Sequence, residues 1–319
     1  MAPDLRPANV YNQAVFQKAS LALAWLACFG VSALGQTLSG RPAELDKAVA
    51  RAMRGRRGSA VVLDVSSGRI LAALNLAGAA RRLARPGSTV KPFTLLALLS
   101  SGAVNPSSHF TCRRKVVVAG HRLDCSHPEP AEGLDAVSAL AYSCNDYFTS
   151  MAARLRPQNL QSAFLHAGLA GPSRLAKQEA KGYVGLTAGV EQLQLQAIGE
   201  ENLRTTPLSL LRAYRNLALR RRNGSDDAAY RTVFAGLEAA TAYGMARLAQ
   251  PPGSVIVAGK TGTTLADEGR WTHGWFAGFA PATRPEIAVV VFLEHGTGPS
   301  DAAPIAGAIF SAYEHRGHP

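Results

Sequence analysis

Three short motifs contain the side chains of this sequence that could carry out chemistry together. They are Ser88–Lys91 (STVK), Ser143–Asn145 (SCN) and Lys260–Gly262 (KTG), in this order along the chain. A serine hydroxyl becomes a nucleophile when a nearby base takes its proton, and a lysine of lowered pKa is one such base. The second and third motifs add hydroxyl, amide and ammonium groups. Together the motifs predict acyl transfer through a covalent intermediate on a serine.

The residues after Ser88 predict that this serine stands at the start of a buried helix. The run Thr94–Ser100 (TLLALLS) is strongly apolar. Pro92 fits only the first turn of a helix, because proline has no amide hydrogen. Ser88 and Lys91 then lie on one face of the helix, about one turn apart. A serine nucleophile that uses a lysine as its base requires this geometry.

The third motif continues an apolar segment, Ser254–Gly259 (SVIVAG), and is therefore expected on a β-strand. Alternation along a strand places Lys260 and Gly262 on one face and Thr261 and Thr263 on the other. Alternation alone does not bring Lys260 and Thr263 into one cleft. A glycine within a strand often marks the close approach of another backbone, and we expect that backbone to be an extended substrate peptide.

The other hydrophobic patterns predict strands near both ends of the domain and helices between them. With 319 residues and 47% apolar side chains, the chain has enough material for a core, which excludes disordered and collagen-like proteins. Strands are expected at 59–65, 69–74, 255–257, 271–279 and 287–293, and helical segments at 40–53, 134–154, 160–167, 207–219, 234–248 and 302–313. Ser143–Asn145 is expected near the start of one such helix. This order indicates an α+β fold, with an antiparallel sheet flanked by helices and a mostly helical insertion over about 95–250.

The N-terminal part of the chain contains one apolar run, Ala19–Leu34. Its length lies between the core of a cleaved export signal and a spanning helix of about 20 residues. A buried core helix is the weaker alternative, because large apolar side chains surround the run instead of lining one face. We therefore expect residues 1–40 to be a membrane anchor or signal segment and residues 41–319 to be the functional domain.

Export would place the chain in an oxidising compartment and would make Cys112 and Cys125 candidates for a disulfide. The stretch between them has the pattern of two short strands, so the bridge would close a small hairpin. A metal site that includes His121 and His127 is the alternative. The segment has neither a CxxC knuckle nor an HxxxH pair, and we expect no metal. Cys144, inside the second motif, is expected to stay reduced.

The formal net charge of +12 has two interpretations. Arginine-rich patches at 51–57 and 220–222 could bind nucleic acid by counterion release. No zinc-finger spacing, recognition helix or interleaved aromatic residues accompany them, and we expect no nucleic-acid partner. A basic surface that faces anionic lipids and wall polymers agrees better with export.

Beyond the three motifs, the sequence resembles the transpeptidase domain of penicillin-binding proteins over roughly residues 59–314. The resembling segments are VVLDVSSGRILAAL at 61–74, RPGSTVKPF at 85–93, TTPLSLLRAYRNLA at 205–218, and the last strands and terminal helix at 274–281 and 303–313. The resemblance implies a β-lactamase/transpeptidase-like fold. It also implies an enzyme that needs no cofactor, since lysine and amide groups supply the acid, base and electrophilic functions.

The resemblance implies roles for the residues of the first two motifs. Ser88 would be acylated, and a neutral Lys91 would take its proton. The pKa of Lys91 would be lowered by burial and by the positive charge of Lys260. Ser143 would pass a proton between Lys260 and the leaving amine, and Asn145 would hold the substrate amide.

The third motif would bind the substrate. Lys260, Thr261 and Thr263, with Gly262 between the threonines, would receive the terminal carboxylate. The backbone amides of Ser88 and Thr263 would form the oxyanion hole.

The resemblance further implies a place and a substrate. The protein would act in the bacterial cell envelope, anchored in the inner membrane or periplasmic, on the D-Ala-D-Ala ends of peptidoglycan stem peptides, and β-lactam antibiotics would bind to it. Only a few tens of residues separate the apolar run from the first strand, so we expect a separate glycosyltransferase to make the glycan strands. Residues 128–133 (PEPAEG) differ from the Gly-His-Gly turn that the family often has at the rim of the cleft.

The leading hypothesis is a D,D-transpeptidase, but the motifs do not encode the acceptor of the acyl group. A D,D-carboxypeptidase or endopeptidase, which uses water, stays open. A β-lactamase would need a base for deacylation, for which Glu200 and Glu201 are candidates, although Glu201 is typical of a solvated position beside a helix. A penicillin sensor or scaffold that keeps the fold without turnover is the non-enzymatic alternative.

Overall fold

The computed structural model describes residues 41–319 except 129–131, 225–226, 268 and 316–319. The apolar run that is expected to be an anchor or signal lies outside the described residues. Within the part of the chain that is described, no helix is both long and apolar enough to cross a membrane.

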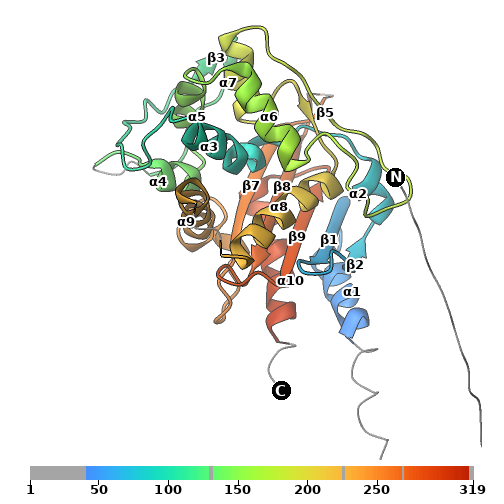
Figure 1. Cartoon of the computed structure of the whole chain (residues 1–319). Coiled ribbons are helices and arrows are strands. Elements are labelled where there is room, and N and C mark those ends of the chain that lie inside the picture. Colours follow the sequence, from blue (N-terminus) through green and yellow to red (C-terminus); the bar gives the residue numbers. More distant parts are fainter. Residues whose placement is uncertain (1–40, 129–131, 225–226, 268, 316–319) are drawn as a thin grey trace, which may run out of the picture. The chain divides into compact units, whose positions relative to one another are not determined.

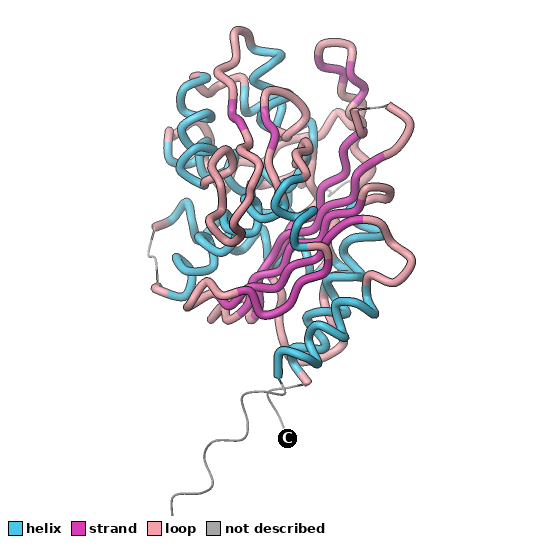
Figure 2. The backbone as a smooth tube through the Cα atoms, turned by 90° about the vertical axis from the view of Figure 1, so that its right-hand side faces the viewer, coloured by secondary structure: helices cyan, strands magenta, loops and turns pink. Residues whose placement is uncertain are grey.

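A five-stranded antiparallel sheet forms the centre of the domain (Figure 2). Its strand order is β2-β1-β9-β8-β7, with β1 at Gly58–Asp64, β2 at Ile70–Leu74, β7 at Ala258–Leu265, β8 at Thr272–Ala280 and β9 at Ile287–Leu293. The first and last strands of the domain meet in the middle of the sheet, because β1 pairs with β9 over its whole length. The third motif lies on β7, which is an edge strand.

Helices cover both faces of the sheet (Figure 1). One face, which includes Val62, packs against α1 (Arg41–Ala52) and α10 (Ala303–Glu314). The other face, which includes Val61, packs against α8 (Pro207–Arg222). Neighbouring valines enter different cores because side chains alternate across a strand. The sheet is thus buried on both sides, which gives the active region a rigid support.

A mostly helical part lies beside the sheet and contains the first two motifs (Figure 1). Its α-helices are α3 (Lys91–Ser100), α4 (Ala136–Ala141), α5 (Asn145–Ala152), α6 (Pro157–Ala167), α7 (Val190–Ala197) and α9 (Ala228–Ala242). The shorter elements of the domain are α2 (Leu76–Arg81), the turns η1 (Gly87–Val90), η2 (Arg247–Ala249) and η3 (Gly298–Ala302), and two small ladders, β3–β4 (Val117–Val118 with His121–Arg122) and β5–β6 (Tyr183–Val184 with Leu203–Arg204).

The predicted α+β class is confirmed. Element boundaries differ from the prediction where tertiary contacts determine the backbone conformation. Residues 287–293 form β9 as predicted. Residues 134–154 are mostly helical as predicted, and they form two helices, α4 and α5, separated at Ser143, whose φ of 57° does not fit a right-handed helix. The prediction that Ser143–Asn145 lies near the start of a helix is confirmed, because α5 begins at Asn145. The strand predicted at 255–257 begins later, at Ala258, and pairing with β8 continues it through the third motif.

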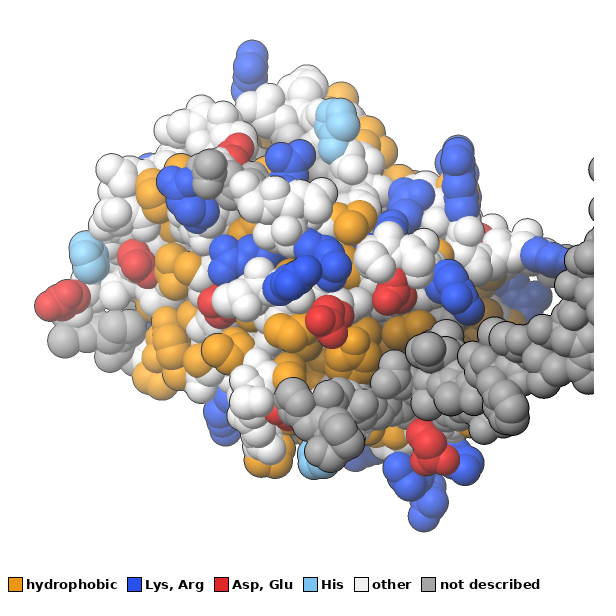
Figure 3. Space-filling model, turned by 60° about the horizontal axis from the view of Figure 1, so that its bottom comes forward, with side chains coloured by type: hydrophobic (Ala, Val, Ile, Leu, Met, Phe, Trp, Pro, Cys, Tyr) orange, Lys and Arg blue, Asp and Glu red, His pale blue; other side chains and the backbone are white. Residues whose placement is uncertain are grey.

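Basic side chains are scattered among other side chains on the face drawn in Figure 3. On the face drawn in Figure 3, Lys and Arg side chains are interspersed with apolar side chains and with Asp and Glu. Proteins that bind nucleic acid typically cluster their positive charge on one face or along one helix. The face in Figure 3 has no such continuous stripe.

Candidate active site

Ser88 lies in the helical turn η1, directly before α3. The predicted helix start is confirmed, although the first turn is a 3₁₀ turn and the α-helix begins at Lys91. Gly87, just before the serine, has a φ of 53°, and a Cβ on it would lie 2.5 Å from Thr264 Cγ2. Only glycine fits here, because the turn needs a left-handed residue and packs closely on β7.

A buried tyrosine fixes the same turn from α8. The Tyr214 hydroxyl donates a 2.8 Å hydrogen bond to the carbonyl of Thr89, next to the nucleophile. Tyr214 is completely buried and also packs edge-on against Phe93 of α3, with ring centroids 5.7 Å apart. The sequence patterns did not single out this tyrosine, since its contact joins residues that are far apart in the chain.

Lys91 is completely buried, and its ammonium group bonds to oxygens of the second motif. Nζ donates to Asn145 Oδ1 at 2.6 Å, to the Ser143 carbonyl at 2.7 Å and to the Ser143 hydroxyl at 3.2 Å. Three acceptors match the three donors of an ammonium group. Burial nevertheless lowers the pKa of Lys91 to about 8. The group therefore rests charged near neutral pH and can give up its proton at small cost.

The second motif connects α4 to α5. Cys144 is the N-cap residue of α5, and its Sγ accepts a hydrogen bond of 3.3 Å from the Tyr147 amide. Asn145 Nδ2 donates to the Leu123 carbonyl at 3.0 Å, while its Oδ1 accepts from Lys91. Both ends of this side-chain amide are engaged within the protein. A side-chain amide has two N–H donors and two acceptor lone pairs, so Asn145 keeps one donor and one lone pair for a substrate amide, as predicted.

β7 packs backbone to backbone against the turn that carries the nucleophile. A Cβ at Gly262 would lie 2.7 Å from the Pro86 carbonyl oxygen and 3.2 Å from the Thr89 nitrogen. At Gly259, the Phe276 ring occupies the space that a Cβ would need. The prediction that a substrate backbone explains these glycines is therefore wrong. The protein's own turn and ring fill the space, because contact this close leaves no room for a side chain.

Lys260 is completely buried, and its Nζ donates to the Thr261 carbonyl at 3.1 Å. Burial and the nearby charge of Lys91 lower the pKa of Lys260 well below its ordinary value. Burial is the largest effect on the pKa of Lys91 and lowers it, as predicted, while the nearby groups that act on Lys91 raise it. The predicted effect of Lys260 on the pKa of Lys91 stays a prediction.

The three motifs meet at a cleft of about 220 Å³. It is lined by Ser88, Ser143, Asn145, Thr261, Gly262 and Thr263, together with residues that the sequence patterns did not assign to it, namely Asp124, Cys125, Ser126, His127, Tyr142, Met245 and Pro299. Lys91 and Lys260 lie behind this surface, fully buried. The two threonine hydroxyls are fixed, because Thr263 Oγ1 accepts from the Gly298 amide at 2.9 Å and Thr261 Oγ1 donates to the Met245 carbonyl at 3.4 Å.

A larger cavity of about 700 Å³ lies elsewhere, between α3, α6 and α8. It contains one serine–histidine contact, Ser162 Oγ to His166 Nδ1 at 3.1 Å. This pair stands one turn apart on the exposed side of α6, and His166 Nδ1 also bonds to the Ser162 carbonyl at 2.8 Å. No buried base or second motif adjoins it among the residues lining this cavity. The smaller cleft is therefore the better candidate for catalysis.

Glu200 and Glu201, the candidate bases for a β-lactamase, lie in different surroundings. Burial raises the pKa of Glu200 to about 7, and its carboxylate lies 3.9 Å from Arg85. Glu201 lies 3.4 Å from His121 near the surface. Neither lines the cleft with Ser88.

The structure does not contain the predicted disulfide between Cys112 and Cys125, since neither cysteine is bridged. Cys144 is not bridged either. The hairpin expected between Cys112 and Cys125 does form, as β3–β4. The spacing suggested a two-cysteine bridge, but the fold brings the third cysteine, Cys144, against the other two.

Comparison with known proteins identifies the family. The family model for the penicillin-binding protein transpeptidase domain matches residues 58–312. The chain belongs to this family. The penicillin-binding protein resemblance of the sequence, which was carried by motifs at 88–91, 143–145 and 260–262, is thereby confirmed.

Two relatives with names are similar to this penicillin-binding protein domain. The peptidoglycan D,D-transpeptidase PbpA of Mycobacterium tuberculosis is 29% identical over 273 residues. The alignment covers 71% of this chain and 54% of PbpA, so the chain spans about half the length of that protein. PbpA of Mycolicibacterium smegmatis is 28% identical over 271 residues, with the same coverage.

Solved structures share the fold. Pseudomonas aeruginosa PBP2 superposes with a TM-score of 0.74 at 24% identity, covering 84% of this chain and 76% of that one. Penicillin-binding protein A of M. tuberculosis, solved as a ceftriaxone acyl-enzyme complex, gives 0.72 at 23% identity and covers 84% and 78%.

Proposed function

We propose that this protein is a peptidoglycan D,D-transpeptidase that forms an acyl-enzyme on Ser88. The observation that supports this proposal most strongly is the meeting of all three motifs at one cleft, with a lysine of lowered pKa buried behind it. A serine at a helix start, three residues before such a base, has the arrangement that nucleophilic catalysis by a serine uses. The named relatives among the D,D-transpeptidases agree with this activity.

In the first half of the reaction, Ser88 Oγ attacks the carbonyl of the penultimate D-Ala. A neutral Lys91 takes the hydroxyl proton as the O–C bond forms. The amide C–N bond then breaks, and the terminal D-Ala leaves as an amine that receives a proton through Ser143, which is hydrogen-bonded to Lys91. Since Ser143 Oγ contacts Lys91, and Lys260 Nζ bonds to the Thr261 carbonyl, we assign this proton transfer to Lys91 and Ser143.

In the second half, an amine of a neighbouring stem peptide attacks the ester carbonyl, and the new amide bond forms. Lys91 takes the proton that the amine loses and gives it to Ser88 Oγ as the Ser88–acyl bond breaks, which restores the serine hydroxyl. The backbone amides of Ser88 and Thr263 would stabilise the oxyanion in both halves, a contribution of about 3–4 kcal/mol for each donor.

We propose that the donor peptide binds along the edge strand β7. β7 pairs with β8 on one side only, and an extended peptide can add to an exposed strand edge. Thr261 and Thr263 lie at the cleft with hydroxyls that could receive the terminal carboxylate. The charge of Lys260 would add to this attraction only when that lysine is protonated, which its lowered pKa opposes.

We further propose that the domain acts in the bacterial cell envelope, with residues 1–40 as its anchor or signal and residues 41–319 as the catalytic domain. A solved complex of PBP2 with MreC from Helicobacter pylori and a peptidoglycan synthase complex that couples polymerisation and crosslinking have similar folds. Those complexes support a separate glycosyltransferase or scaffold as a partner of this protein too.

The test is a donor peptide ending in D-Ala-D-Ala, incubated with the full chain and an excess of an amine acceptor. We expect the amine product with wild type and with Ser108→Ala, an exposed control serine, and at least about 1000-fold less product with Ser88→Ala. Release of D-Ala into water alone would make the protein a carboxypeptidase. Rapid, repeated hydrolysis of penicillin would make it a β-lactamase and would give Glu200 a role.

A further inference from the structure

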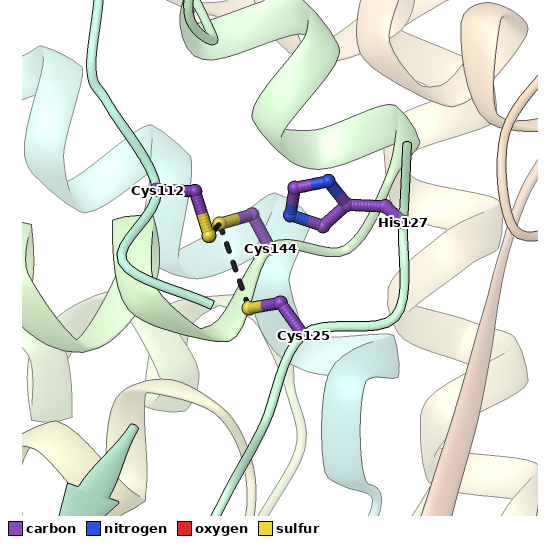
Figure 4. A group of neighbouring side chains, drawn as sticks. All are labelled: Cys112, Cys125, His127 and Cys144. Carbon is purple, nitrogen blue, oxygen red and sulfur yellow. Dashed lines mark hydrogen bonds between the residues drawn. The ribbon is translucent and has the colours of Figure 1, made fainter. Parts of the chain in front are cut away.

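Three cysteines and a histidine converge beside the cleft, from three separate parts of the chain. Their ligand atoms, the sulfurs of Cys112, Cys125 and Cys144 and a ring nitrogen of His127, all lie within 4.8 Å of one another. Figure 4 shows the three sulfurs together with the imidazole beside them. Cys112, Cys144 and His127 are buried, and Cys125 is partly buried. The mechanism above uses none of these four side chains.

The sulfur distances fit a shared metal ion better than a covalent bond. Cys144 Sγ lies 3.5 Å from Cys112 Sγ and 3.8 Å from Cys125 Sγ. A disulfide would need about 2.05 Å. Around a tetrahedral zinc ion with Zn–S bonds of about 2.3 Å, two sulfurs are roughly 3.8 Å apart. Three sulfurs also cannot all pair in disulfides, whereas a metal engages all three.

His127 is oriented as a metal ligand. Its Nδ1 makes a 2.7 Å hydrogen bond to the Pro128 carbonyl, which places the proton on Nδ1 and the lone pair on Nε2. Nε2 is buried and has no hydrogen-bond partner among the described residues, and the side chain is only 3% exposed. The ring is further held by stacking on Tyr142, with centroids 5.6 Å apart. A carbonyl on one nitrogen and a metal on the other is the usual arrangement of a metal-bound histidine.

The sulfurs also have the surroundings of thiolate ligands. The Arg114 amide donates to Cys112 Sγ and the Tyr147 amide donates to Cys144 Sγ, each at 3.3 Å. Such outer contacts hold metal ligands in position and stabilise their negative charge.

From these observations we infer that Cys112, Cys125, His127 and Cys144 form a tetrahedral Cys₃His site for zinc. The ligand set is that of a closed structural zinc site. Sequence spacing argued against a metal because the ligands do not come in CxxC or HxxxH pairs. Thiols and imidazole favour zinc over hard cations such as calcium or magnesium. Binding replaces the protons of the three thiols, which are released to solvent.

The site would fix the second motif. Cys144 stands between Ser143 and Asn145, and Asn145 Nδ2 bonds to the Leu123 carbonyl, two residues before Cys125. A metal that joins Cys125 to Cys144 therefore clamps the loop and the motif that holds Lys91. It is a structural role, and no step of the reaction passes through the ion.

The first experiment measures zinc in the full chain, purified without chelator, by inductively coupled plasma mass spectrometry. We expect about one zinc per chain. Replacement by Co²⁺ should give the intense visible ligand-field bands and the thiolate-to-cobalt absorption of a tetrahedral sulfur-rich site. Both readouts are made without penicillin or peptide, so they are independent of the proposed transpeptidase activity.

Variants locate the site. Cys125→Ser and His127→Ala should each lower zinc affinity by more than the roughly 10–100-fold that the loss of an outer contact costs. His121→Ala, an exposed histidine in the same segment, is the matched control and should keep wild-type zinc. If the variants do not fold, the cobalt spectrum of wild type still decides. Wild-type chain without bound zinc and without a cobalt spectrum, or with a disulfide between two of the three cysteines by intact mass, overturns the proposal.

Discussion

The cleft has two walls that are built by different means. One, the nucleophile wall, consists of residues 86–91 and 260–263, where a turn and a strand pack so closely that Gly87 and Gly262 have no room for a Cβ. The other, the cysteine wall, consists of residues 112–127 and 143–145, where side chains make the contacts, including the sulfur cluster and the Asn145 bond to Leu123. Backbone-to-backbone packing holds the nucleophile wall together, and contacts between polar side chains hold the cysteine wall together.

The difference explains how each wall responds to change. Backbone packed on backbone leaves few ways to relax, so a small side chain in the nucleophile wall should displace Ser88 itself. Side-chain contacts in the cysteine wall can each be removed alone. The loss of stability from each substitution there should therefore be small, and the losses from different substitutions should be separable. The following predictions test this contrast.

The largest effect is expected in the nucleophile wall, for Gly87→Ala. Alanine would have to adopt a φ of 53° and its Cβ would lie 2.5 Å from Thr264 Cγ2. A displacement of Ser88 by about 1 Å should lower the acylation rate by about 100-fold or more. Gly55→Ala is the matched control, because Gly55 also has a positive φ, 73°, but no atom near its Cβ position. Stopped-flow acylation by a fluorescent penicillin measures the rate of both variants. If both lose the same acylation rate, backbone strain alone explains the effect, and close packing on β7 does not.

The pH profile should reveal the buried lysine that joins the two walls. Burial lowers the pKa of Lys91 to about 8, so below that pH the lysine is protonated and cannot accept the Ser88 proton. The second-order acylation rate should fall about tenfold for each pH unit below 8 and level off above it. Acylation rates from pH 6 to 10 provide the measurement. A rate that is flat from pH 6 to 9 would rule out Lys91 as the base that titrates.

In the cysteine wall, Arg113→Ala should weaken the contact between the loop and α5. Arg113 binds the buried Asp146 carboxylate through its backbone amide at 2.7 Å and through its guanidinium group. Losing the side chain leaves part of a buried charge unpaired, and the free energy of unfolding should fall by about 1.5–3 kcal/mol. Urea unfolding measures this. Arg122→Ala, which removes an exposed pair with Asp124, should have little effect; similar losses in both variants would show that burial does not matter here.

The smallest effect is expected for Tyr214→Phe, on the α8 side of the nucleophile wall. The change removes the 2.8 Å bond to the Thr89 carbonyl and should lower the free energy of unfolding by about 1–2 kcal/mol. Thermal unfolding followed by circular dichroism measures it. Tyr183→Phe, half exposed, is the control. A larger loss of acylation than of stability would show that the bond also positions Ser88.

The two walls also differ in how much of their structure could be predicted from the sequence. A continuous apolar run fixes β9, because every residue of this strand is buried. Helical spacing of apolar residues after Pro207 fixes α8, and Pro92 fixes the start of α3. The Lys260–Thr263 segment has no such pattern, since its glycines and threonines serve the cleft, and pairing with β8 is what makes it a strand. The helix and the strand of the nucleophile wall were therefore predicted, but the residue at which the strand begins was not.

The cysteine wall could not be predicted from spacing. Cys112, Cys125 and Cys144 are separated along the chain, and only the fold brings Cys144 next to the other two. The sequence showed a two-cysteine hairpin, while the third thiol and the buried nitrogen of His127 become informative only once the fold is known.

The central claim is that these two walls meet at Ser88 to form an acyl-enzyme. The full chain, wild type and Ser88→Ala, is incubated with a penicillin and measured by intact mass, with peptide mapping of any adduct. The account predicts one adduct on Ser88 that persists for minutes to hours, and none on Ser88→Ala. An adduct that forms equally on Ser88→Ala, or one that maps to another serine, would contradict it.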